Sequence, residues 1–253
     1  MAFVDVAGAR IEVERIDVGR GSAAPVVMLH EGLGSVAMWK DFPHRVAHAV
    51  NRDVLVYSRA GYGRSSPAML PRGVRYMHDE ALIVLPRLLD ACGIERPILL
   101  GHSDGASIAL IHAGSADRTV AGLALMAPHV VVEDVSIASI AAAKVAWSAT
   151  GLRARLARYH DDVDGAFTGW NDIWLHPDFR AWNIEGHVRG VRCPILAIQG
   201  EDDEYGTMDQ VERIERLAPD VDLVRLADCR HSPHRDQPDA VLEALVRFVD
   251  RLP

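Results

Sequence analysis

The stretch that decides the fold is Pro97-Ile98-Leu99-Leu100-Gly101-His102-Ser103-Asp104-Gly105-Ala106-Ser107-Ile108-Ala109-Leu110. An apolar run leads into Gly-His-Ser-Asp-Gly, and a small-residue helical pattern follows at once, which is the strand–turn–helix arrangement of a G-x-S-x-G nucleophile elbow. Glycines at both ends of the motif allow the strand and helix to approach closely around a strained serine. The bare motif arises by chance in about one chain in ten of this length, so partner residues are needed.

Apolar strands alternate with helical patterns on both sides of this motif. The strands are expected at 25–29, 53–57, 97–100, 120–126, 194–199 and 221–226, after an edge hairpin at 2–18; the helices are expected at 38–50, 78–92, 104–114, 209–217 and 238–252. This order predicts an α/β fold with a mostly parallel, twisted sheet flanked by helices.

Residues 129–190 interrupt the alternation because they contain no convincing strand. They carry Trp147, Trp170, Trp174 and Trp182, which favours a helical lid (cap) insertion whose tryptophans form its core, with some facing a pocket. We therefore predict an α/β core at 1–128 and 191–253 and a lid at 129–190.

The composition is that of an ordinary globular protein. The 253 residues fit one α/β domain, the net charge is −8, and arginines are scattered, so a nucleic-acid partner is not expected. Cys92, Cys193 and Cys229 are odd in number and far apart, which indicates neither a disulfide framework nor a zinc site and favours a reducing cytoplasmic location.

Neither the first ten residues nor the longest apolar run has the pattern of a targeting or membrane-spanning segment. Residues 1–10 carry Asp5 and lack the features of a signal peptide. The apolar run 135–149 is too short for a membrane span and contains Lys144, so a helix covering a pocket is expected, with a peripheral membrane helix as the alternative.

Two loops at the carboxyl ends of predicted parallel strands supply the partners that a serine nucleophile needs. Residues 200–206 offer Asp202 or Asp203 as the acid, and residues 228–234 offer His231 or His234 as the base. The two histidines could instead bind a metal, but no third ligand is evident, so no metal and no cofactor are expected.

Taken together, these motifs resemble those of α/β-hydrolase-fold serine hydrolases over nearly the full length. His30-Glu31-Gly32-Leu33-Gly34 is similar to the oxyanion loop, Arg59-Ala60-Gly61-Tyr62-Gly63-Arg64-Ser65 to the Arg-Gly-x-Gly-x-Ser loop, Gly200-Glu201-Asp202-Asp203 to the acid loop, and Arg230-His231-Ser232-Pro233-His234 to the Gly-His loop. Glu31 and Arg230 depart from the family pattern, since each replaces a usual glycine.

The resemblance implies a catalytic triad of Ser103, Asp203 and His231. It implies an oxyanion hole from the amides of Asp104 and Gly32, with Leu33 as the neighbouring alternative to Gly32. We add Glu31, Leu33, Trp170 and Trp174 as candidate substrate-binding residues. His30 and Arg59 are expected to shape their loops, and whether Glu31 pairs with Arg59 or contacts substrate stays open.

The predicted function is hydrolysis of a small or medium carboxylic ester or thioester with an apolar or aromatic portion. Alternatives are a carbon–carbon bond hydrolase of ring-cleavage products, a lactonase, or a ligand-binding member of the fold with low turnover. A haloalkane dehalogenase is disfavoured because Ser103, not a carboxylate, stands at the centre of the elbow.

Overall fold

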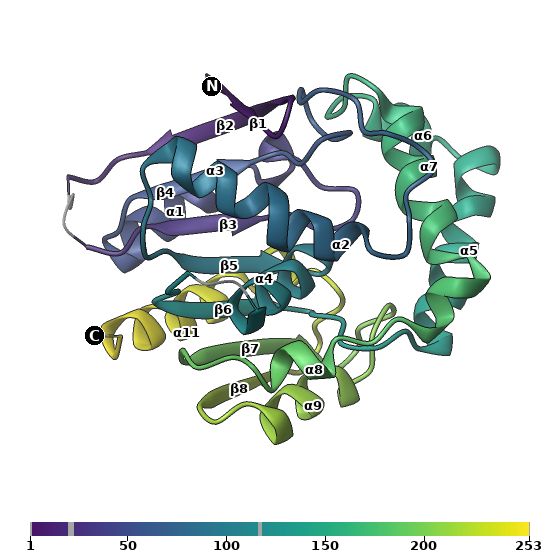
Figure 1. Cartoon of the computed structure of the whole chain (residues 1–253). Helices are drawn as coiled ribbons and strands as arrows, with labels where there is room; N and C mark the ends of the chain where they lie inside the picture. The colour runs from purple at the N-terminus through teal and green to yellow at the C-terminus, as the bar shows by residue number, and fades with distance from the viewer. Residues whose placement is uncertain (1, 20–22, 116–117, 253) are drawn as a thin grey trace.

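An eight-stranded, mostly parallel sheet forms the centre of the computed structural model, which describes residues 2–19, 23–115 and 118–252 (Figure 1). Residues 1 and 253, the outer ends of the predicted core segments, lie outside these ranges. The strand order is β1-β2-β4-β3-β5-β6-β7-β8, and only the β1–β2 and β2–β4 pairs are antiparallel. The strands are β1 Ala2–Val6, β2 Ala9–Ile16, β3 Val26–Leu29, β4 Val54–Tyr57, β5 Ile98–His102, β6 Gly122–Met126, β7 Ile195–Gly200 and β8 Val221–Leu226. The predicted fold class and the predicted strand order along the chain are confirmed.

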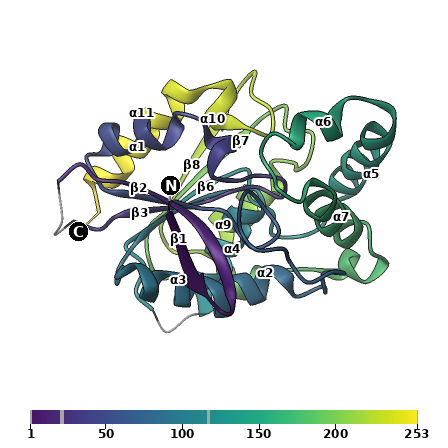
Figure 2. The same ribbon diagram turned by 90° about the horizontal axis from the view of Figure 1, so that it is seen from above.

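Helices cover both faces of the sheet (Figure 2). One face carries α1 (Phe42–Val50) and α11 (Pro238–Asp250); the other carries α2 (Tyr76–Asp79), α3 (Leu85–Cys92), α4 (Asp104–Ser115) and α9 (Asp209–Leu217). Successive strand residues alternate between the two cores, so Met28 and Leu100 pack with α1 and α11, whereas Val27 and Leu99 pack with α3 and α4. Burial on both faces explains why the central strands are continuously apolar.

Two predicted helices differ in detail from those observed. The helix expected at 38–50 is split into the 3₁₀ helix η1 (Val36–Trp39) and α1, because Lys40 has a non-helical backbone with a φ of 55° and Pro43 lies in the first turn of α1. The helix expected at 78–92 starts earlier, at Tyr76, and contains the π-helical segment η2 (Glu80–Val84). Pro86 follows this segment and cannot donate a helical hydrogen bond.

Between β6 and β7 the chain is helical, as predicted for this region. It forms α5 (Asp134–Ala149), α6 (Leu152–Leu156), α7 (Val163–Trp174), the 3₁₀ helix η3 (Pro177–Ala181) and α8 (Glu185–Val188). Helices α5, α6 and α7 group together beyond one end of the sheet (Figure 1), whereas α8 packs against α4. Within the described residues, no helix is both long and apolar enough to cross a membrane.

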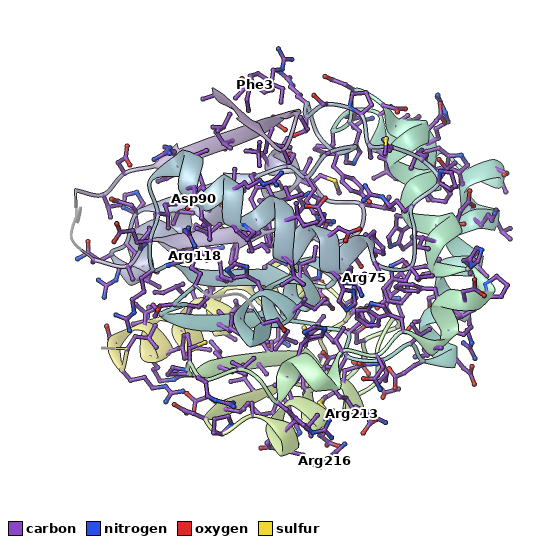
Figure 3. All side chains as sticks on the ribbon, in the orientation of Figure 1. Phe3, Arg75, Asp90, Arg118, Arg213 and Arg216 are labelled. Carbon is purple, nitrogen blue, oxygen red and sulfur yellow. The ribbon has the colours of Figure 1, made fainter. Side chains whose placement is uncertain are left out.

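Charged side chains on the outer faces form ion pairs between elements (Figure 3). Arg118 pairs with Asp90 of α3, and Arg213 of α9 pairs with Glu185 at 2.7 Å and with Asp209 at 2.6 Å. The Glu185 contact connects α9 to α8, whereas the Asp209 contact lies within α9. Exposed pairs of this kind contribute only about 0–1 kcal/mol each, so the apolar layers rather than these pairs stabilise the fold.

Candidate active site

Ser103 lies in the sharp turn between β5 and α4. Its φ of 53° is in the left-handed region, and its backbone N–H donates to the Met126 carbonyl of β6 at 2.9 Å. A Cβ at Gly105 would come within 2.1 Å of the Leu29 carbonyl oxygen, and one at Gly101 within 2.5 Å of the Ala106 backbone. Only glycine therefore allows the close approach of strand, helix and β3 that holds Ser103 in this conformation.

His231 stands between Ser103 and Asp203. Its Nε2 is 3.0 Å from Ser103 Oγ, and its Nδ1 is 2.9 Å from both carboxylate oxygens of Asp203. These three residues come from the loops after β5, β7 and β8, so the carboxyl ends of three parallel strands bring them together. A hydroxyl, an imidazole and a carboxylate in this chain can activate the hydroxyl as a nucleophile.

The Asp203 carboxylate is held in place by several donors. Oδ1 accepts from the backbone N–H groups of Tyr205 at 2.7 Å and Gly206 at 3.2 Å, and Oδ2 accepts from Gln199 Nε2 at 2.8 Å. Burial alone would raise the pKa of Asp203, but His231 and these backbone donors lower it below the usual value. The neighbouring Asp202, the alternative acid, is exposed to solvent.

His234, the alternative base, is buried between Trp39 and Phe42 at ring-centroid distances of 4.8 and 5.4 Å. Neither of its ring nitrogens has a hydrogen-bond partner among the described residues. Burial holds the pKa of His234 well below its usual range, so its ring is neutral. Across residues 2–19, 23–115 and 118–252, no group of three or more histidine, cysteine, aspartate or glutamate side chains could hold a metal ion.

Arg59 and His30 hold the loop after β3. The Arg59 guanidinium donates to the carbonyl oxygens of His30 at 2.5 Å and Glu31 at 3.0 Å, and the Arg59 backbone N–H donates to His30 Nε2 at 3.0 Å. The Glu31 carboxylate points elsewhere: Oε2 lies 3.5 Å from His102 Nδ1, and Oε1 lies 3.6 Å from Arg235. Glu31 therefore meets Arg59 through its main chain, not through an ion pair.

A cavity of about 110 Å³ opens beside Ser103 and His231. Its wall includes Glu31, Gly32, Leu33, Asp104, His129, Ile140, Trp170, Trp174 and Tyr205. Trp170 of α7 packs so tightly on the loop after β3 that a Cβ at Gly32 would come within 2.3 Å of the indole. The Asp104 carboxyl turns away into the core, where it accepts from Tyr76 at 2.7 Å and burial raises its pKa. Only the backbone of Asp104, which begins α4, therefore faces the Ser103 side of the cavity.

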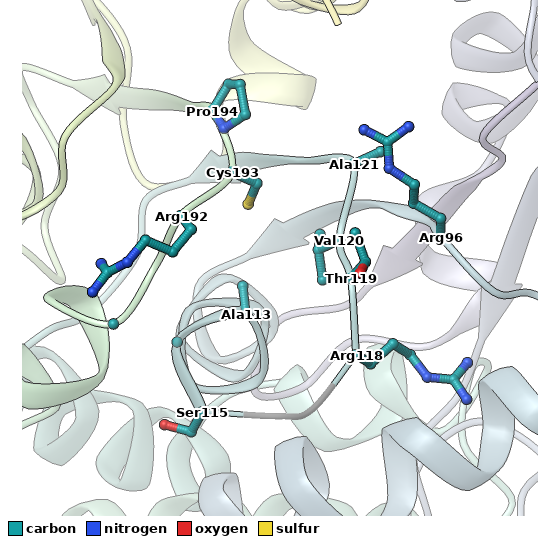
Figure 4. A pocket seen from close by; sticks show the side chains of 12 residues that line it. Arg96, Ala113, Ser115, Arg118, Thr119, Val120, Ala121, Arg192, Cys193 and Pro194 are labelled. Carbon is teal, nitrogen blue, oxygen red and sulfur yellow. The ribbon is translucent and has the colours of Figure 1, made fainter. Parts of the chain in front are cut away.

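A larger cavity of about 690 Å³ lies at the opposite edge of the sheet, where residues 96, 120–121 and 193–194 precede β5, β6 and β7 (Figure 4). Burial raises the pKa of its Cys193 thiol to about 11, so this group is protonated at neutral pH. Functional sites of open α/β sheets lie at the carboxyl ends of strands. This rule favours the smaller cavity beside Ser103 as the active site, although the other cavity is larger.

Residues 26–244 match the sequence model of the alpha/beta hydrolase family. The chain belongs to this family.

Relatives of this hydrolase include enzymes with diverse names. It is 28% identical to a putative carbamate hydrolase RutD of Pseudomonas savastanoi pv. phaseolicola, covering 90% of this chain and 94% of that protein. It is 26% identical to an N-formylmaleamate deformylase of Pseudomonas putida, and the match covers 92% of this chain and 90% of that protein. The solved enol-lactonase of Burkholderia xenovorans has a TM-score of 0.77 at 19% identity and covers 98% of this chain and 100% of that one, which shows a common fold.

Three residues that sequence reasoning missed stand close to His231 in the hydrolase. His102 contacts the His231 backbone, and the rings of His129 and Tyr205 lie 5.8 and 4.7 Å from its imidazole. Burial and the nearby His231 ring lower the pKa of His129 to about 3, so His129 is neutral. His129 and Tyr205 follow the carboxyl ends of β6 and β7, and His102 lies in the elbow motif. These positions in the sequence were the signal that could have indicated a place near the site.

Proposed function

We propose that this hydrolase cleaves a small or medium carboxylic ester or thioester through an acyl-enzyme on Ser103. The observation that carries the proposal is the hydrogen-bonded chain Ser103–His231–Asp203 beside a cavity. A base within 3.0 Å of a serine hydroxyl, itself oriented by a carboxylate, is the geometry that nucleophilic acyl transfer requires.

In this mechanism His231 Nε2 takes the proton of Ser103 as its Oγ attacks the substrate carbonyl. Asp203 accepts the Nδ1–H of the ring, selects its tautomer and stabilises the imidazolium. The backbone N–H groups of Asp104 and Gly32 receive the oxyanion, a role worth about 3–4 kcal/mol for one donor. The imidazolium then protonates the leaving group, and water repeats the sequence to release the acid.

The cavity sets the expected size of the acyl group. The accessible space beside Ser103 is about 110 Å³, below the roughly 300–1,000 Å³ of common ligand pockets, so the acyl group is expected to be small. We propose that Leu33, Trp170 and Trp174, with the Glu31 side chain at one edge, contact this group. The substrate is then a small molecule whose acyl portion is short and largely apolar.

We propose that residues 129–190 act as a lid on a core formed by 1–128 and 191–253. Support comes from Ile140 of α5 and from Trp170 and Trp174 of α7, which line the cavity together with residues of the core. Substrate selection would therefore depend on the lid, and the chemistry on the core. The free thiols of Cys92, Cys193 and Cys229 support the reducing cytosol as the location.

Cleavage of a carbon–nitrogen acyl bond is a second candidate. Two relatives aligned over nine-tenths of the chain are named a putative carbamate hydrolase and an N-formylmaleamate deformylase. A small acyl cavity suits such compact groups as well as short esters.

Labelling with a fluorophosphonate probe, together with a substrate panel, tests the proposal. Native protein is expected to be labelled and to hydrolyse 4-nitrophenyl acetate, and Ser103→Ala is expected to lose both. Ser115→Ala, at the far end of α4, is the matched control and should keep both. Undiminished ester turnover by Ser103→Ala would contradict the mechanism. Short amides, carbamates and a vinylogous diketo acid in the same panel distinguish carbon–nitrogen and carbon–carbon cleavage from ester hydrolysis.

A further inference from the structure

One buried imidazole contacts both loops that flank Ser103. His102, the second residue of the elbow motif, is only 1% exposed. Its Nε2–H donates to the backbone carbonyl of His231 at 2.7 Å, and its Nδ1 lies 3.5 Å from Glu31 Oε2. His102 therefore connects the loop of the proposed base to the loop of the proposed oxyanion hole.

The contacts of His102 indicate where its protons are. A carbonyl oxygen only accepts, so Nε2 carries a proton. Nδ1 has no hydrogen-bond partner within the described residues and faces the Glu31 carboxylate. A bare Nδ1 would direct its lone pair at an anion, whereas a protonated Nδ1 forms an ion pair with it.

The surrounding groups keep the Glu31 carboxylate ionised. Burial alone would raise the pKa of Glu31, but His102, with a smaller contribution from Arg235, holds it well below the usual range. Of these groups, Arg235 lies on the opposite carboxylate oxygen at 3.6 Å. The His234 ring, 4.9 Å from His102, is neutral because burial and the neighbouring His102 lower its pKa. Two further titratable neighbours are His231, whose ring lies 5.2 Å from that of His102, and His129, whose pKa is lowered by burial and in part by His102.

We propose that Glu31 and His102 form an ion pair that positions the catalytic base: Glu31 keeps His102 doubly protonated, and His102 fixes the backbone carbonyl of His231. The inference rests on the proposed function, since the orientation of His231 matters because that residue acts as the base. Both are positioning residues, and neither exchanges a proton with substrate. The glutamate that departs from the family's usual glycine thereby gains a role.

Loss of His102 should reduce turnover without greatly changing substrate binding, whereas Glu31, which is proposed to lie at the edge of the acyl site, is assessed by kcat alone. A charge-assisted hydrogen bond is about twice as strong as a neutral one. Glu31→Gln is therefore expected to weaken the hydrogen bond from His102 to the His231 carbonyl and to lower kcat about threefold. His102→Leu removes the donor altogether and should lower kcat about tenfold, with KM nearly unchanged. His102→Gln, which retains an N–H donor, is expected to lie between these two variants.

The protonation state can be measured directly with ¹⁵N-histidine-labelled protein by NMR at pH 7.5, with His102→Gln used to assign the signals. Native His102 should show two protonated ring nitrogens, and Glu31→Gln should convert it to the singly protonated Nε2–H form. Arg235→Gln is the matched control, because Arg235 contacts the same carboxylate but not His102; it should leave His102 doubly protonated.

A singly protonated His102 in the native protein, or native kcat in both Glu31→Gln and His102→Leu, would overturn the inference. Failure of the proposed function would look different. In that case Ser103→Ala would retain turnover or native protein would show none, while the NMR result on His102 would stand unaltered.

Discussion

Asp203 is the buried carboxylate that holds the His231 ring, with both oxygens 2.9 Å from Nδ1. Replacing it by asparagine would present an amide to the ring and favour the wrong tautomer, so Asp203→Asn should lower kcat by about 10⁴-fold. Steady-state hydrolysis of 4-nitrophenyl acetate measures this loss. Asp202→Asn, one residue earlier and exposed, is the control and should retain native turnover. Equal losses in the two variants would argue against Asp203 as the orienting acid.

Gly105 is the residue on which the elbow depends sterically. A Cβ there would lie 2.1 Å from the Leu29 carbonyl oxygen, which is backbone and cannot move aside without distorting β3. Gly105→Ala is therefore expected to lower the free energy of unfolding by about 3 kcal/mol, measured by urea denaturation. Gly186→Ala, in α8 with nothing within 4 Å of its Cβ, should be neutral or stabilising. A Gly105→Ala variant as stable as native protein would show that strand and helix are not tightly packed here.

Helix α7 supplies the indole that packs on the loop after β3 and limits the cavity. Trp170→Ala should enlarge the acyl space, so the kcat/KM ratio of hexanoate to acetate esters is expected to rise about tenfold or more. A series of 4-nitrophenyl esters of increasing chain length measures this ratio. Trp147→Ala, which removes an indole stacked on Phe167 outside the cavity wall, should leave the preference unchanged. An unaltered preference in Trp170→Ala would remove α7 from the proposed specificity determinants.

At the scale of the whole molecule, buried neutral histidines make the fold sensitive to acid. Burial lowers the pKa values of His30, His112, His129, His160 and His234. Because each folded pKa lies below the unfolded value of about 6.5, the unfolded state binds more protons as pH falls below that value. Stability should therefore be complete above about pH 6.5 and fall below it, by up to about 1.4 kcal/mol per pH unit for each histidine.

Urea denaturation at several pH values tests this dependence. From pH 7.5 to 5.5 the free energy of unfolding should fall by at least about 3 kcal/mol, whereas between pH 7.5 and 8.5 it should fall by no more than about 1 kcal/mol, as cysteine thiols ionise in the unfolded chain. The raised pKa values of Glu80 and Asp104 act in the opposite sense, but two carboxyls do not offset five imidazoles. Equal stability at pH 7.5 and 5.5 would contradict the assignment of these histidines as neutral.

The sequence predicted the features that depend on neighbouring residues. The elbow around Ser103 and the strands predicted at 194–199 and 221–226 follow from local apolar patterns and glycines, since backbone preference and side-chain periodicity act over a few residues; the first of these strands is observed at Ile195–Gly200. The π-helical segment before Pro86 and the break at Lys40 were missed because tertiary packing decides among conformations of similar local energy.

By itself, the sequence determined the α/β architecture, the hydrolase family and the loops that carry Ser103, Asp203 and His231. Only the tertiary structure decided the size of the cavity, the packing of Trp170 on Gly32 and the contact of His102 with Glu31 and the His231 carbonyl. His102 and His231 are 129 positions apart in the chain, and such contacts leave no periodic signal. They arise when separate strands are brought to one edge of a sheet, so their distances depend on the packing of the whole core.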